Sequence, residues 1–107
     1  MTSPKLETFR AMVAKNPSNP LVRFGLSNEL LKSELWDEAA EHLRTYLATY
    51  DDEGNGYGRL AQACEALGRR PEARDALQRG ISAAQRFGHP GLASELANRL
   101  EELEEDA

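Results

Sequence analysis

The sequence is poor in the residues on which disulfide frameworks, metal sites and membrane spans depend. Its 107 residues include one cysteine and two histidines, His42 and His89. No apolar run approaches the ~18 residues of a transmembrane helix. A single cysteine forms no intrachain disulfide, and two distant histidines without neighbouring cysteines do not match the ligand spacing of a metal site. We therefore expect a cytoplasmic protein without metal, cofactor or membrane insertion.

Basic residues are also in deficit, and this bears on the class of partner. The chain has 13 lysines and arginines against 18 aspartates and glutamates, which gives a formal net charge of -5. Proteins that bind nucleic acid without sequence preference need a concentrated basic surface to displace counterions from phosphates. The charge balance therefore excludes nucleic acid as an expected partner.

The most informative feature present is a repeat of the sequence at an interval of 34 residues. Two columns of apolar residues recur three times, four residues apart, which is one turn along one helix face. These columns are Phe9, Leu43 and Leu77, and Val13, Leu47 and Ile81. A fixed period of about 20 to 50 residues is typical of stacked repeat proteins, in which each unit buries its apolar face against its neighbours.

Helix signals dominate within each repeat. Alternation of apolar and polar residues is not sustained anywhere, and prolines mark four helix starts, at Pro4, Pro20, Pro71 and Pro90. An all-α fold of about six antiparallel helices is therefore predicted. Their expected ranges are 4–16, 20–33, 37–50, 55–68, 71–86 and 90–105.

The residues at helix starts and turns resemble the tetratricopeptide repeat family over nearly the whole chain. Trp36-Asp37-Glu38-Ala39 and Pro71-Glu72-Ala73 are similar to the opening of that family's second helix, and Leu67-Gly68-Arg69 is similar to its turn. The resemblance, to a small stand-alone bacterial-type member, implies a right-handed α-solenoid and a single domain over residues 1–107. Its parts would be an opening helix (4–16), repeats 20–53 and 54–87, and a capping helix (90–105).

The resemblance also implies a noncatalytic module that binds a protein or peptide. In this family the first helices of successive repeats line a concave groove that holds an extended peptide or a partner helix. Carried onto this chain, the groove residues are Phe24, Asn28, Leu31, Lys32, Arg59, Gln62 and Glu65, with Asn98 or Glu101 added from the last helix. The carboxylate clamp of one family variant is not expected, because Phe24 and Arg59 replace two of its residues.

The opening helix suggests an alternative function. It corresponds to a second helix that has lost its hairpin mate, and its apolar residues Leu6, Phe9, Met12 and Val13 would form an open edge. Such an edge could pair with another copy. Self-assembly, as a homodimer, is therefore the alternative to peptide binding.

The remaining chemically notable residues have structural interpretations. Cys64 falls in the column of Leu30, so we expect a small buried hydrophobe without the exposure of a nucleophile. Asp51 and Asp52 are expected to be solvated turn residues, next to Gly54 and Gly56, which should loosen the start of a helix. Because phosphate loops and nucleophile motifs are also missing, an enzyme is not expected.

Overall fold

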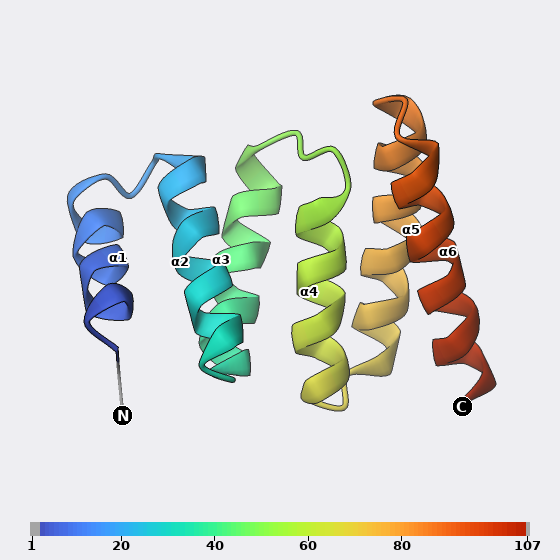
Figure 1. Cartoon of the computed structure of the whole chain (residues 1–107), viewed down its shortest axis with the longest axis horizontal. Coiled ribbons are helices and arrows are strands. Elements are labelled where there is room, and N and C mark those ends of the chain that lie inside the picture. The colour runs from blue at the N-terminus through green and yellow to red at the C-terminus, as the bar shows by residue number, and fades with distance from the viewer. Residues whose placement is uncertain (1–2, 107) are drawn as a thin grey trace.

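The computed structural model describes residues 3–106, which form six helices and no strand. The helices are α1 (Pro4–Lys15), α2 (Pro20–Lys32), α3 (Trp36–Thr49), α4 (Asn55–Ala66), α5 (Arg70–Arg86) and α6 (Pro90–Glu105). Each helix packs against the next one along the chain, so the six follow one another from one end of the molecule to the other (Figure 1). The predicted all-α solenoid is confirmed.

Helices α1 and α2 begin where a side chain satisfies the first free N–H groups. The Ser3 hydroxyl accepts a hydrogen bond from the Leu6 amide of α1 at 3.1 Å. The Asn19 side chain accepts from the first amides of α2 in the same way. Proline follows each cap, where its missing N–H removes no intrahelical bond. Local sequence alone therefore defines these two starts.

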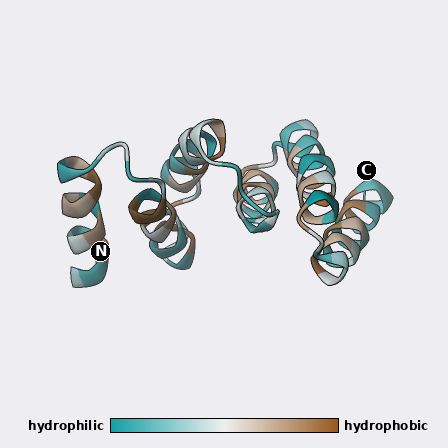
Figure 2. Cartoon of the chain, turned by 90° about the horizontal axis from the view of Figure 1, so that it is seen from above, coloured by the Kyte–Doolittle hydropathy of each residue, from teal (hydrophilic) through white to brown (hydrophobic). Residues whose placement is uncertain are grey.

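The helices lie in two staggered rows. Seen from above, α3 and α5 form one row, and α2, α4 and α6 form the other (Figure 2). Small residues of the 34-residue repeat, among them Ser27, Ala39, Ala61 and Ala73, are fully buried. Such residues permit close helix approach, while large side chains fill the core between them. The fully buried leucines among these large side chains are Leu6, Leu26, Leu30, Leu43, Leu77 and Leu96.

The predicted apolar edge of α1 is wrong for most of its residues. The side chains of Leu6 and Val13 are buried in the core, and Phe9 packs against the core with its ring over Gly25. A methyl group added at Gly25 would lie 2.5 Å from a ring carbon of Phe9. Of the four predicted edge residues, only Met12, which is 39% exposed, remains open. The apolar residues of α1 thus serve packing within the chain.

The joint between α3 and α4 also differs from expectation, because Asp52 is buried with 1% of its surface exposed. One carboxylate oxygen accepts a hydrogen bond from the Tyr46 hydroxyl at 2.6 Å. The other accepts from the amides of Gly54 and Gly56 at 2.7 and 2.8 Å, and so caps the start of α4. The prediction of a solvated Asp52 and a loose helix start is wrong. Only Asp51 is solvated as expected.

The Tyr46 hydroxyl is held as a donor within this joint. Burial, followed by the hydrogen bond to Asp52, raises the pKa of Tyr46 well above its usual value. The ring also packs against Phe24, with 4.8 Å between the ring centroids. Tyr46 therefore connects α2, α3 and the joint that leads into α4.

Three helix ends use the same tight turn. Glu34, Gly68 and Gly88 adopt left-handed φ values of 58°, 74° and 75°. In each turn the next amide donates to the carbonyl five residues before it, as in Leu35 to Leu30, Arg69 to Cys64 and His89 to Ala84. Glycine adopts this conformation freely, whereas a glutamate does so at a cost of about 1 kcal/mol.

Glu34→Gly is accordingly expected to raise the free energy of unfolding by about 1 kcal/mol, since it removes this backbone strain. Urea unfolding followed by circular dichroism measures the change. Glu34→Gln, which keeps a side chain on the left-handed residue, is the control and should leave stability nearly unchanged. A Glu34→Gly protein no more stable than Glu34→Gln would contradict the strain.

An ion pair repeats with the same 34-residue period. The Arg10 guanidinium donates to both carboxylate oxygens of Glu38, which joins α1 to α3. The Arg44 guanidinium does the same to Glu72 and joins α3 to α5. These hydrogen bonds lower the pKa of both glutamates. Paired side chains thus connect successive second helices of the stack.

Acidification below pH 6.5 is expected to reduce stability through His42. A guanidinium nitrogen of Arg23 lies 2.8 Å from His42 Nδ1, and because guanidinium only donates, this nitrogen must be unprotonated. Burial, and then the charge of Arg23, lower the pKa of His42 below its ordinary 6.5. The folded chain therefore binds a proton at His42 less readily than the unfolded chain does. The stabilisation that neutral His42 contributes is complete above pH 6.5 and is lost as pH falls through the folded-state pKa.

Urea unfolding at pH 7.5, 6 and 5 measures this loss, with His42→Gln as the comparison. The variant should lose less stability over this interval than the original chain. Parallel pH profiles of the two proteins would contradict the role of His42. The ion-paired Glu38 and Glu72 should add a further loss below pH 4.5, their ordinary pKa.

Candidate functional site

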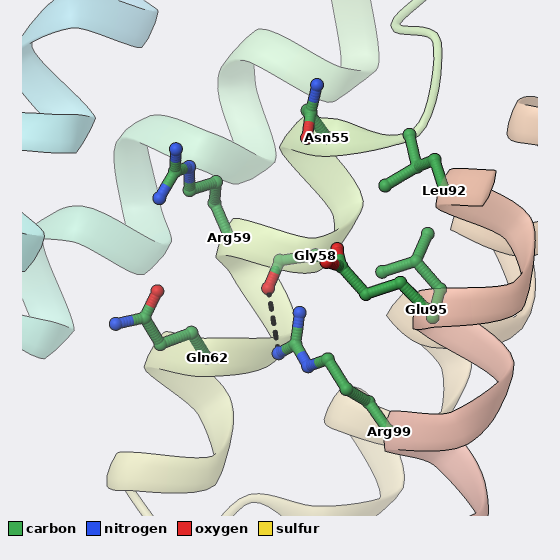
Figure 3. Close-up of a pocket in the computed structure, with 8 residues that line it drawn as sticks. Asn55, Gly58, Arg59, Gln62, Leu92, Glu95 and Arg99 are labelled. Carbon is green, nitrogen blue, oxygen red and sulfur yellow. Dashed lines mark hydrogen bonds between the residues drawn. The ribbon is translucent and has the colours of Figure 1, made fainter. Parts of the chain in front are cut away.

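A hollow of about 150 Å³ lies between α4 and α6, on the side of the stack formed by α2, α4 and α6 (Figure 3). Its lining residues are Asn55, Gly58, Arg59, Gln62, Leu92, Glu95, Leu96 and Arg99. Glu95 and Arg99 of α6 extend toward α4, whereas Arg59 and Gln62 extend from the side of α4 that faces away from α6 (Figure 3). The hollow therefore combines a small apolar base with several hydrogen-bonding groups.

The hollow depends on a glycine in the middle of α4. A methyl group at Gly58 would lie 3.1 Å from both Leu96 and Arg99 of α6, so the missing side chain lets the two helices approach. The Arg99 guanidinium uses this space to donate to the Gly58 carbonyl at 3.2 Å, as the dashed line in Figure 3 shows. It also lies 3.4 Å from the Glu65 carboxylate. Arg99 therefore holds α6 to α4 at the edge of the hollow.

Several polar groups of the hollow are left without a partner in the chain. Among residues 3–106, Arg59, Gln62 and Glu95 take part in no ion pair and no side-chain hydrogen bond, and all three are exposed. Together they offer a cation, an anion and an amide that both donates and accepts. The hollow thus presents charges of both signs as well as hydrogen-bond donors and acceptors.

Two of the three groove residues predicted on α4 line this hollow. Arg59 and Gln62 line the hollow, and Glu65 lies at its edge through its ion pair with Arg99. From this side of the stack they present a continuous polar strip along α4.

The predicted residues of α2 are less uniform. Leu31 is 6% exposed and packs in the core, so it offers no groove surface, and Phe24 is half-buried against Tyr46. Lys32 is exposed and pairs with Glu29 at 3.3 Å. The Asn28 side-chain oxygen is buried without a hydrogen-bond partner within residues 3–106. The groove residues that the family resemblance predicts on α2 therefore include buried core residues as well as surface residues.

Sequence reasoning missed the contribution of α6. Asn98 and Glu101 do not line the hollow, whereas Leu92, Glu95 and Arg99 do. A signal was available, because Leu96 follows Leu60 by 36 residues, and the same interval carries Arg59 onto Glu95. Arg99 had no such signal, since that interval matches it to Ala63, a buried alanine.

The structure offers little support for chemistry elsewhere in the chain. Cys64 is buried, which raises the pKa of its thiol to about 11 and keeps it protonated at neutral pH. Within residues 3–106, no group of three His, Cys, Asp or Glu side chains is placed to hold a metal ion. None of the helices in the same range is long and apolar enough to span a membrane.

Comparison with known proteins identifies the family. No family model matches the chain. It is 30% identical over 99 residues to TPR repeat-containing protein PA0015 of Pseudomonas aeruginosa, which covers 92% of this chain and 94% of that protein. It is also similar to the solution structure of protein BPP2914 from Bordetella parapertussis, with a TM-score of 0.81, 30% identity, and coverage of 99% of this chain and 91% of that one. The chain belongs to the tetratricopeptide repeat proteins.

Proposed function

We propose that this protein is a noncatalytic interaction module that binds a segment of a partner protein on the side formed by α2, α4 and α6. The observation that carries the proposal is the hollow between α4 and α6, whose lining includes Arg59, Gln62 and Glu95, all unpaired within residues 3–106, together with Leu92 and Leu96. Exposed polar groups that find no partner within the chain are free to bind one. The rest of the stack holds them in place.

The dimensions of the hollow favour a polypeptide over a small-molecule substrate. Its volume of about 150 Å³ is below the ~300 Å³ at which small-molecule pockets begin, and it accommodates one or two side chains. Because the hollow continues along α4 as a polar strip, an extended peptide could place one side chain in it and its backbone on Gln62. The opposite charges of Arg59 and Glu95 favour a ligand of mixed charge.

Affinity capture from source cells tests the proposal. Arg59→Glu combined with Gln62→Ala should weaken retention of the principal partner at least about tenfold, because a few central residues carry most of the free energy of an interface. The helical content and Tm should stay unchanged, since both side chains are exposed. Arg79→Glu, an equal charge change on α5, is the matched control. Equal loss in the control, or full retention by the groove variant, would contradict the proposal.

Self-assembly through the N-terminal edge is the alternative, and on α1 it now depends on Met12. Sedimentation velocity at low and high micromolar concentration distinguishes the two functions. A strictly monomeric protein would remove the alternative. A dimer that dissociates in Met12→Glu would favour it, and this variant is preferable to a change at Leu6, which would disrupt the core.

A further inference from the structure

A second hollow, of about 340 Å³, is lined by residues of the α2–α3 turn, the start of α3 and the C-terminal end of α4. The α2–α3 and α4–α5 turns lie on the same edge of the stack, the lower one in Figure 1. Its apolar lining comes from Leu35, Trp36 and Leu67, and Leu35 is 37% exposed. Glu34, Asp37 and Glu38 complete the lining. None of these residues lines the hollow between α4 and α6, so the two sites are separate.

The charges at this second hollow are not all neutralised within the chain. The Asp37 carboxylate lies 3.1 Å from Arg69, and Glu38 is bound by Arg10 at 2.7 Å. Glu34 takes part in no ion pair or side-chain hydrogen bond among residues 3–106. An unneutralised carboxylate thus lines the same hollow as an indole and two leucines.

We propose that this hollow docks a second protein partner through an arginine side chain carried next to an apolar residue. Charge complementarity identifies the arginine, since a guanidinium can stack on the face of Trp36 and bind the Glu34 carboxylate with its N–H groups. Leu35 and Leu67 receive the apolar neighbour. A lone acidic side chain would find no cation available here, because Arg10 and Arg69 are already paired.

The left-handed backbone of Glu34 allows one substitution to separate binding from stability. The two equivalent turns have glycine, and Glu34→Gly relaxes the left-handed residue while it removes the carboxylate. Stability and binding should therefore change in opposite directions in one variant. A purely structural residue would not separate them, because loss of binding would follow loss of folding.

Trp36 is the only tryptophan of the chain, so its fluorescence reports on this hollow directly. The probe is an acetylated and amidated Leu-Arg-Leu-Arg-Leu peptide, and the control peptide has citrulline, a neutral analogue, in place of arginine. Addition of the arginine peptide to the whole chain should change the fluorescence of Trp36. The citrulline peptide, Glu34→Gln and Glu34→Gly should each weaken binding about fivefold, as expected for one partly exposed ion pair.

Two further variants test whether the peptide binds by nonspecific charge attraction or in the hollow between α4 and α6. Glu105→Gln removes one exposed negative charge elsewhere, and Arg59→Glu alters the other hollow; both should bind the peptide as the original chain does. Glu34→Gly should also melt a few degrees higher. Equal affinity for the two peptides, unchanged affinity in Glu34→Gln, or equal weakening by Glu105→Gln would each overturn the proposal. So would sedimentation that shows a dimer of the chain which the arginine peptide dissociates.

Discussion

Asp52→Ala is expected to lower the free energy of unfolding by about 3 kcal/mol or more. The substitution removes three hydrogen bonds at once and leaves the Tyr46 hydroxyl and the amides of Gly54 and Gly56 without partners in a buried joint. Each buried polar group left unsatisfied costs about 1–3 kcal/mol. The start of α4 also loses the negative charge that stabilises it.

Urea unfolding at pH 7.5 measures this loss, with two variants of graded severity beside it. Asp52→Asn keeps an acceptor for the two amides, and Tyr46→Phe removes only the hydroxyl, so each should cost less than Asp52→Ala. A loss below 1 kcal/mol in Asp52→Ala would mean that water replaces the carboxylate without difficulty. The joint would then not be the rigid element described above.

Gly54→Ala is expected to cost about 3 kcal/mol for a different reason. Gly54 has a φ of 128°, which residues with a side chain rarely adopt. Its added methyl group would also lie 2.9 Å from Leu92 Cδ2, 3.1 Å from the Gly80 carbonyl oxygen and 3.3 Å from Ala84 Cβ. Backbone strain and overpacking therefore act together, and neither can relax without moving α5 or α6.

Gly68→Ala is the matched control for Gly54→Ala. Gly68 also has a positive φ, of 74°, but a methyl group there would meet nothing within 4 Å. This variant should cost only about 1 kcal/mol, from backbone strain alone. Thermal and urea unfolding of both variants measure the difference. Equal losses would show that the contacts of Gly54 with α5 and α6 contribute nothing.

The joint around Asp52 and Gly54 also connects stability to the proposed groove. Leu92, which would meet a side chain at position 54, lines the hollow between α4 and α6. A change that moves Leu92 therefore alters the hollow as well as the packing. We expect binding by Gly54→Ala to weaken even under conditions in which the protein remains folded.

The features that local sequence determines were predictable. Helix starts at Ser3-Pro4 and Asn19-Pro20 require only neighbouring residues. The 34-residue columns could be read because repeated burial keeps the same residue types, as in Leu43 and Leu77. Arg10 and Arg44 are 34 residues apart, and so are Glu38 and Glu72. The sequence alone does not show that each arginine pairs with a glutamate, because the pairs form between helices of different repeats.

The joint and the complete groove could not be read from the sequence in the same way. Asp52 is an acidic residue in a short connection, and nothing local indicates that Tyr46 turns back to bind it. Leu31 and Lys32 are adjacent on α2, yet Leu31 is buried and Lys32 is exposed. An alignment to the family that is uncertain by one residue therefore cannot tell which side chain is exposed. Arg99 lines the hollow although the 36-residue interval matches it to the buried Ala63, so the repeat pattern gave no sign of its position.

The most direct test of groove binding is an amide NMR spectrum of the protein with and without the principal partner recovered by affinity capture. The largest shifts are expected on residues 55–62 of α4 and 92–99 of α6, including the side-chain amides of Asn55 and Gln62. Arg59→Glu combined with Gln62→Ala should abolish them. Shifts confined to α1, α3 and α5 would contradict the groove as the binding site.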